Sequence, residues 1–132
     1  MPRSVVAPDA LRAALRALDA GERPDPVTLQ AAVLHLLHAL ARKAPGRAVE
    51  VRVPPYGAVQ CDTTQRGDPN NPAALQAPTH RRGTPPNVVE TDPVTWLLVA
   101  TGQLSWPAAI RDGRLTQSGV RADLSSVLVG LW

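Results

Sequence analysis

The spacing of apolar residues changes twice along this 132-residue chain, and those changes limit the folds open to it. From residue 8 to residue 44, apolar side chains recur every three or four positions, as on the buried face of a helix. Residues 49–53 (Val-Glu-Val-Arg-Val) then alternate strictly, as in a strand with one face in water. After residue 92 the helical spacing returns. Helices, then strands, then helices again predict an α+β domain.

Two helices are expected within residues 1–46. Gly21 can end the first of them. Asp25-Pro26 can start the second, with Asp25 as the N-cap and proline in the first turn. The apolar stripe of the first helix consists of Leu11, Ala14, Leu15 and Leu18, and that of the second consists of Leu29, Val33, Leu36, Leu37 and Leu40.

The remaining residues, 47–132, are expected to complete a single domain that covers 1–132. The turn-forming sequence at 54–57 (Pro-Pro-Tyr-Gly) predicts a hairpin, and residues 87–90 and 115–117 predict two further short strands. Late helices are predicted by Asp92-Pro93, by Ser105, and by the spacing of Leu124, Val127, Leu128 and Leu131. We therefore expect a small antiparallel sheet of about four to five strands, packed on one face by helices.

One internal stretch, residues 63–79, has little to bury. It is polar and contains Asp68-Pro69-Asn70-Asn71-Pro72. Ordered connections are seldom this long. We expect a flexible loop.

Composition narrows the classes of partner. The net charge is +3, but the arginines are dispersed, only Arg81 and Arg82 being adjacent, and no aromatic residues are interleaved with them. A nucleic-acid surface needs a clustered basic stripe or stacking rings, so we expect no nucleic-acid partner. The chain has no Phe and one Tyr, so an apolar pocket would be walled mainly by aliphatic side chains.

The cysteine content, the longest apolar stretch and residues 1–7 together predict the cellular location. Cys61 is the only cysteine, which excludes an internal disulfide and suits a reducing compartment. The longest apolar stretch, residues 31–41, is interrupted by His35 and His38 and is too short to span a bilayer. No signal sequence is recognisable at residues 1–7. We expect a cytoplasmic protein without a membrane span.

Candidate catalytic and metal-binding residues are few. His35 and His38 lie three positions apart and could share a metal, but a third ligand is missing, so surface histidines are the better interpretation. Cys61 precedes an acidic residue, which disfavours a thiolate, and is expected to pack as a small apolar residue. No Gly-x-Ser-x-Gly or Gly-rich phosphate motif is present. We predict no catalytic residues, no metal and no cofactor; an enzyme built around His80 or the histidine pair is the least favoured class.

Several stretches together resemble one protein family. They are VEVRVPPYGAVQC at 49–61, residues 80–92, DPVTWL at 92–97, TGQLSW at 101–106 and DGRL at 112–115. Their order and spacing resemble the small bacterial relatives of sterol carrier protein 2, over roughly residues 45–132. The resemblance implies an antiparallel sheet capped by helices around an apolar tunnel that holds a sterol, fatty acid or acyl chain, with no chemistry. Similar domains are also appended to enzymes as accessory domains.

The resemblance and the apolar faces of the predicted elements suggest a ligand site. Its hydrophobic walls are predicted to be Val51, Val53, Val59, Trp96, Leu97, Ala100, Leu124 and Leu128. Arg81 or Arg82 is the candidate for an anionic headgroup, the alternative being a solvated turn. The competing hypothesis is an accessory or protein-interaction domain with a filled core, in which large side chains such as Trp96 occupy that space. The sequence names no protein partner.

Overall fold

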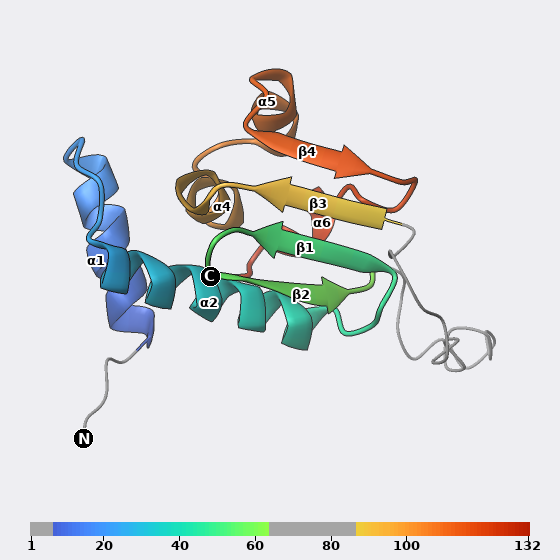
Figure 1. The fold of residues 1–132 in the computed structure, drawn as a ribbon, viewed down its shortest axis with the longest axis horizontal. Helices are drawn as coiled ribbons and strands as arrows, with labels where there is room; N and C mark the ends of the chain where they lie inside the picture. The colour runs from blue at the N-terminus through green and yellow to red at the C-terminus, as the bar shows by residue number, and fades with distance from the viewer. Residues whose placement is uncertain (1–6, 64–86) are drawn as a thin grey trace.

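The computed structural model describes residues 7–63 and 87–132 of the chain (Figure 1). In chain order the elements are α1 (Ala7–Asp19), α2 (Pro26–Lys43), β1 (Val49–Val53), β2 (Gly57–Cys61), β3 (Asn87–Thr91), α4 (Pro93–Ala100), α5 (Trp106–Arg111), β4 (Leu115–Ser118) and α6 (Ser125–Leu128). The expected α+β class is confirmed. Apart from Thr63, the predicted loop at 63–79 lies outside the described residues.

The first two helices form as their sequences predict. Asp25 caps α2, because its Oδ1 accepts a hydrogen bond from the backbone N–H of Thr28 at 3.0 Å and its Oδ2 accepts one from the Thr28 hydroxyl at 2.8 Å. Helix α1 packs across the N-terminal half of α2 (Figure 1). None of the described helices is both long enough and apolar enough to cross a bilayer.

The four strands form one mixed sheet in the order β2-β1-β3-β4. Two pairings are antiparallel, but β1 and β3 run parallel, with Val49 opposite Asn87. The expectation of an antiparallel sheet is therefore wrong at this pair. The hairpin partner β2 already occupies one side of β1, and the long connection from Cys61 to Asn87 lets the chain return to the starting end of β1. A parallel pairing needs such a long connection, whereas a hairpin turn allows only an antiparallel one.

The parallel register of β1 and β3 is held at the first residue of β3. Asn87 is buried, its Nδ2 donates to the carbonyl oxygen of Ala48 at 2.8 Å, and its Oδ1 accepts from the backbone N–H of Arg121 at 2.9 Å. At the other end of the same connection, the backbone N–H of Asp62 donates to the carbonyl of Ala44 at 2.8 Å.

In the part of the chain that the structure describes, one face of the sheet is buried and the other is at least partly exposed. Val49, Val51 and Val53 of β1 have no exposed surface, while Glu50 and Arg52 between them are partly exposed and form an ion pair at 2.9 Å. The buried face joins a single core cluster with α1, α2, α4, α5 and the end of α6. Figure 1 shows α6 behind the sheet and α2 running alongside β2.

The last helix is shorter than predicted. We expected Leu124 to Leu131 to be helical, but α6 covers only Ser125–Leu128. Leu124 offers no capping side chain, and Gly130 takes a left-handed conformation (φ 74°) that ends the helix. The following residues run beside α2, where the ammonium group of Lys43 donates a hydrogen bond to the carbonyl of Val129.

Candidate ligand-binding cleft

The eight predicted wall residues come together, but in two different settings. Val59 is partly buried against the core, and Val51, Val53, Trp96, Leu97 and Leu124 have no exposed surface. Ala100 and Leu128 are also nearly buried, yet these two border an open cleft. Of the eight predicted wall residues, only this pair is among those that line the cleft.

Trp96 fills the interior between α2 and α4. Its ring is fully buried, and its Nε1 donates to the carbonyl oxygen of Val33 at 3.3 Å. The hydrogen bond satisfies the one polar atom of the indole, so the ring sits in the core without an unpaired donor. The filled-core hypothesis expected Trp96 to occupy the space between the sheet and the helices.

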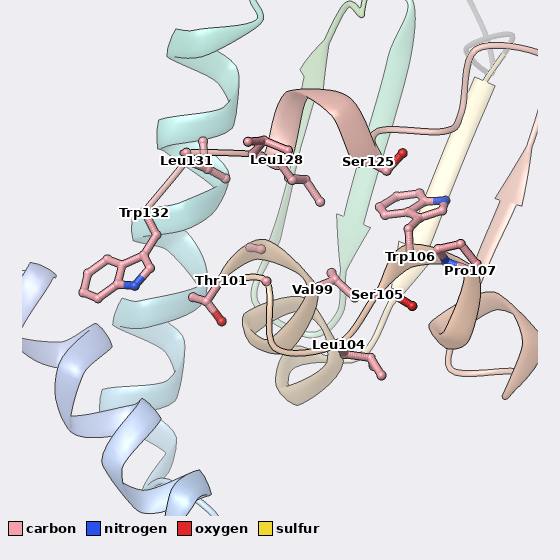
Figure 2. A pocket seen from close by; sticks show the side chains of 14 residues that line it. Val99, Thr101, Leu104, Ser105, Trp106, Pro107, Ser125, Leu128, Leu131 and Trp132 are labelled. Carbon is pink, nitrogen blue, oxygen red and sulfur yellow. The ribbon is translucent and has the colours of Figure 1, made fainter.

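The cleft lies elsewhere, between the α4–α5 turn and the C-terminal segment (Figure 2). Its volume is about 460 Å³. Residues 99–107 form one wall and residues 125–132 form the other. The apolar side chains on these walls that the sequence analysis did not assign to a site are Val99, Leu104, Trp106, Val129, Leu131 and Trp132.

Local sequence explains why a cleft opens here. Helix α4 ends at Ala100, and Gly102 with φ 82° reverses the chain so that the N–H groups of Gln103 and Leu104 reach the carbonyl of Leu98. Across from this turn, Gly130 takes the chain out of α6. Both walls are therefore short segments around a glycine. The apolar Val129, Leu131 and Trp132 around Gly130 were the sequence signal for the second wall.

Two tryptophans stand at opposite ends of the cleft (Figure 2). Trp106 is 6% exposed, and its Nε1 donates to Oε1 of Gln117 at 2.6 Å. Trp132 is 51% exposed and packs at the outer end. One end is thus closed by an anchored ring and the other by a ring that faces solvent.

Polar groups of the lining are mostly engaged with the protein. The Thr101 hydroxyl donates to the carbonyl of Leu97 at 2.7 Å, and the Ser125 hydroxyl donates to Oδ1 of Asp123 at 2.7 Å. Oγ of Ser105 accepts from the N–H of Ala108 at 3.2 Å. Among the described residues that line the cleft, none has an ionisable side chain. Such a lining suits hydrocarbon.

The described titratable candidates, His35, His38 and Cys61, are not among the residues that line the cleft. His38 is exposed as predicted, whereas His35 is half-buried, and burial together with Arg42 and His38 lowers the pKa of its imidazole. Within residues 7–63 and 87–132, no three His, Cys, Asp or Glu side chains gather closely enough to hold a metal. His80, Arg81 and Arg82 lie outside the described residues.

Cys61 packs in the core at the end of β2, as predicted. Burial, with a smaller contribution from Asp62, raises the pKa of its thiol to about 11. The thiol is therefore neutral at physiological pH and is a poor nucleophile.

Fold and cleft together define a small α+β domain with helices on one face of a mixed sheet and an apolar cleft at the α4–α5 turn. The model of the family described as bacterial SCP ortholog matches residues 25–129. The chain belongs to this family, which confirms the resemblance predicted from the sequence. The match begins at the N-cap of α2, after α1. No curated protein matches the chain significantly.

Proposed function

We propose that the chain binds a hydrophobic ligand, the acyl portion of a lipid, in the cleft between residues 99–107 and 125–132, without altering it chemically. The observation that carries this proposal is the apolar cleft of about 460 Å³. Its size lies within the range of roughly 300–1,000 Å³ that small-molecule sites occupy. Membership of the bacterial SCP orthologues favours a lipid over other apolar ligands.

The proposed site differs from the walls predicted from sequence. The buried face of the sheet and the helices share one core of fully buried side chains, Trp96 among them, so a ligand there would have to displace this packing. We therefore keep Ala100 and Leu128 and place the ligand against Leu104, Leu131 and Trp132. Arg81 and Arg82 stay candidates for a headgroup on sequence grounds, and the cytoplasm stays the proposed location.

A non-catalytic role is supported by the chemistry of the lining. The Thr101 hydroxyl donates to a backbone carbonyl, and the Ser125 hydroxyl donates to the carboxylate of Asp123. No histidine is among the described residues that line the cleft, so neither hydroxyl is paired there with the base that usually activates a nucleophile. Binding is driven by burial at about 0.8 kcal/mol per methylene. An eight-carbon chain then gains roughly 6 kcal/mol, which association costs reduce, so the expected Kd is tens of micromolar or weaker.

Titration with decanol, followed by amide chemical shifts, tests the site. We expect the shift changes to concentrate in residues 99–107 and 125–132. Leu131→Arg puts a charge on the cleft wall and should weaken binding at least about tenfold, because a charge in an apolar site is costly. Val120→Arg is the matched control, since Val120 is 98% exposed and does not line the cleft. Saturable binding that Leu131→Arg leaves unchanged would place the ligand elsewhere, and no binding at all would refute the function.

The filled interior favours a second candidate, an accessory domain that binds a protein segment. In that case the exposed Val129 and Trp132 would contact a polypeptide. Native mass spectrometry of the protein purified from its host distinguishes the carrier role from the accessory role. A co-purifying lipid supports the carrier role, and a stoichiometric polypeptide supports the accessory role.

A further inference from the structure

Trp106 lies at one end of the cleft, which we call its inner end, and its indole nitrogen donates a hydrogen bond to one side chain. Trp106 is the first residue of α5, and its ring lies below Ser125 with the nitrogen pointing away from Leu128 (Figure 2). That nitrogen donates to Oε1 of Gln117 at 2.6 Å. The ring is 6% exposed, so an indole N–H without this acceptor would be left unpaired in a nearly buried place.

Gln117 occupies a position where the strand pattern calls for an apolar residue. It lies on the same face of β4 as the buried Leu115, and its cross-strand neighbour Val89 is fully buried. Gln117 is nevertheless exposed, because β4 is an edge strand and its side chain reaches toward α5. Its contribution is therefore the hydrogen bond to the indole rather than burial of apolar surface.

The two buried tryptophans are held in different ways. Trp96 donates to a backbone carbonyl of α2, which cannot move without the helix. Trp106 donates to a side chain with several rotamers on an edge strand. The orientation of the Trp106 ring is therefore the more easily changed of the two, and with it the inner end of the cleft.

We infer that Gln117 is a positioning residue that holds the Trp106 indole as the end wall of the cleft and thereby limits the length of the hydrocarbon the cleft accepts. This inference rests on the proposed function. Gln117 does not line the cleft itself, so it acts through Trp106.

The test compares Gln117→Leu, which removes the acceptor, with Gln117→Glu, which keeps one. Thr116→Val is the matched control, because Thr116 is the exposed neighbour on the opposite face of β4. The probes are octanol, decanol and tetradecanol, and the second readout is the indole ¹H–¹⁵N resonance of Trp106, assigned with Trp106→Phe. We expect Gln117→Leu to shift this resonance upfield, because the indole N–H loses its acceptor. Decanol binding should weaken about three- to tenfold, which is the usual net contribution of one hydrogen bond. The preference for decanol over tetradecanol should also fall. Gln117→Glu should stay within about twofold of the unaltered protein.

The outcomes separate this inference from the proposed function. If the unaltered protein binds decanol and Gln117→Leu keeps both the affinity and the chain-length preference, Gln117 has no positioning role, although the cleft still binds lipid. If the unaltered protein binds none of the alcohols, the proposed function fails and this inference fails with it. If Gln117→Leu does not fold, Trp106→Phe replaces it, because this variant removes the hydrogen-bond donor. An unchanged chain-length preference in Trp106→Phe overturns the inference.

Discussion

The interior around Trp96 and the cleft around Trp106 both depend on α4, yet one is filled and the other is open. Trp96 is enclosed by α4 and α2 in a core that includes the buried face of the sheet. Past Ala100 the same helix leads into a turn, and the opposing wall is a one-turn helix with the segment after it. The difference teaches that an apolar surface closes completely when regular elements cover it, and stays open when short segments around glycines do.

The interior should therefore determine the stability of the fold, and the cleft should determine the affinity for ligand. Changes in the interior should lower the free energy of unfolding, and changes at the rim of the cleft should alter ligand affinity with little effect on folding. Four expected effects test this division, beginning with the largest.

Truncating Trp96 should lower the free energy of unfolding the most. Trp96→Ala removes a fully buried ring and leaves a cavity, so we expect the free energy of unfolding to fall by about 3–5 kcal/mol. Urea denaturation followed by circular dichroism measures this. A loss below about 1 kcal/mol would mean that the interior is loosely packed, and would reopen the space between sheet and helices as a ligand site.

Alkaline pH should destabilise the core through Cys61. The folded pKa is raised from 9.0 to about 11, so between these values the unfolded chain releases a proton that the folded protein keeps. Stability is unaffected by this thiol below about pH 9 and falls as the pH rises, by roughly 1 kcal/mol at pH 10. Cys61→Ala should lose this part of the pH dependence. Fast labelling of the native thiol by Ellman's reagent at pH 8 would contradict its burial.

Asp92 supports both regions, because it caps the helix they share. Its carboxylate accepts hydrogen bonds from the hydroxyl and backbone N–H of Thr95 at 2.6 and 3.0 Å. Partial burial acts to raise the pKa of Asp92, but these bonds and the charge of Arg114 lower it below its ordinary value. The stabilisation is therefore present above about pH 4 and is lost as the pH falls further.

Asp92→Ala should cost about 1 kcal/mol of unfolding free energy, the usual value of an N-cap, and should also weaken ligand binding slightly. Asp92→Asn keeps a capping oxygen and is the control. Equal losses in both variants would show that the cap hydrogen bonds contribute little.

The smallest effect on stability is expected for Trp132. Trp132→Ala should change the free energy of unfolding by no more than about 0.5 kcal/mol, because half of the side chain is exposed. Decanol affinity should fall severalfold in the same variant. A large loss of stability without a change in affinity would assign Trp132 to the core and break the division between the two regions.

Local chemistry made much of the fold predictable. Asp25-Pro26, Asp92-Pro93 and Ser105 start helices where expected, because each places a capping oxygen within reach of the N–H three residues after the cap. The alternation at residues 49–53 likewise identified the buried strand face. These features depend on neighbours in the sequence.

The features that depend on distant contacts were not predictable. The parallel pairing of β1 with β3 is decided by which side of β1 is left free by β2. The cleft depends on where α6 ends and on the path of residues 129–132 beside α2. Apolar periodicity marked Leu124 and Leu128 alike, but only the folded arrangement separates the core residue from the cleft residue.

Asn87 has a consequence for how this domain tolerates change. Because its side chain fastens the start of β3 to Ala48 and Arg121, and the Asp62 N–H fastens the end of β2 to Ala44, both borders of residues 63–86 are fixed independently of what joins them. Loop-closure entropy rises only slowly with length. An epitope or a small reporter domain inserted there should leave the pairing of β1 with β3 intact, which makes this connection the natural place for grafting new sequence into the domain.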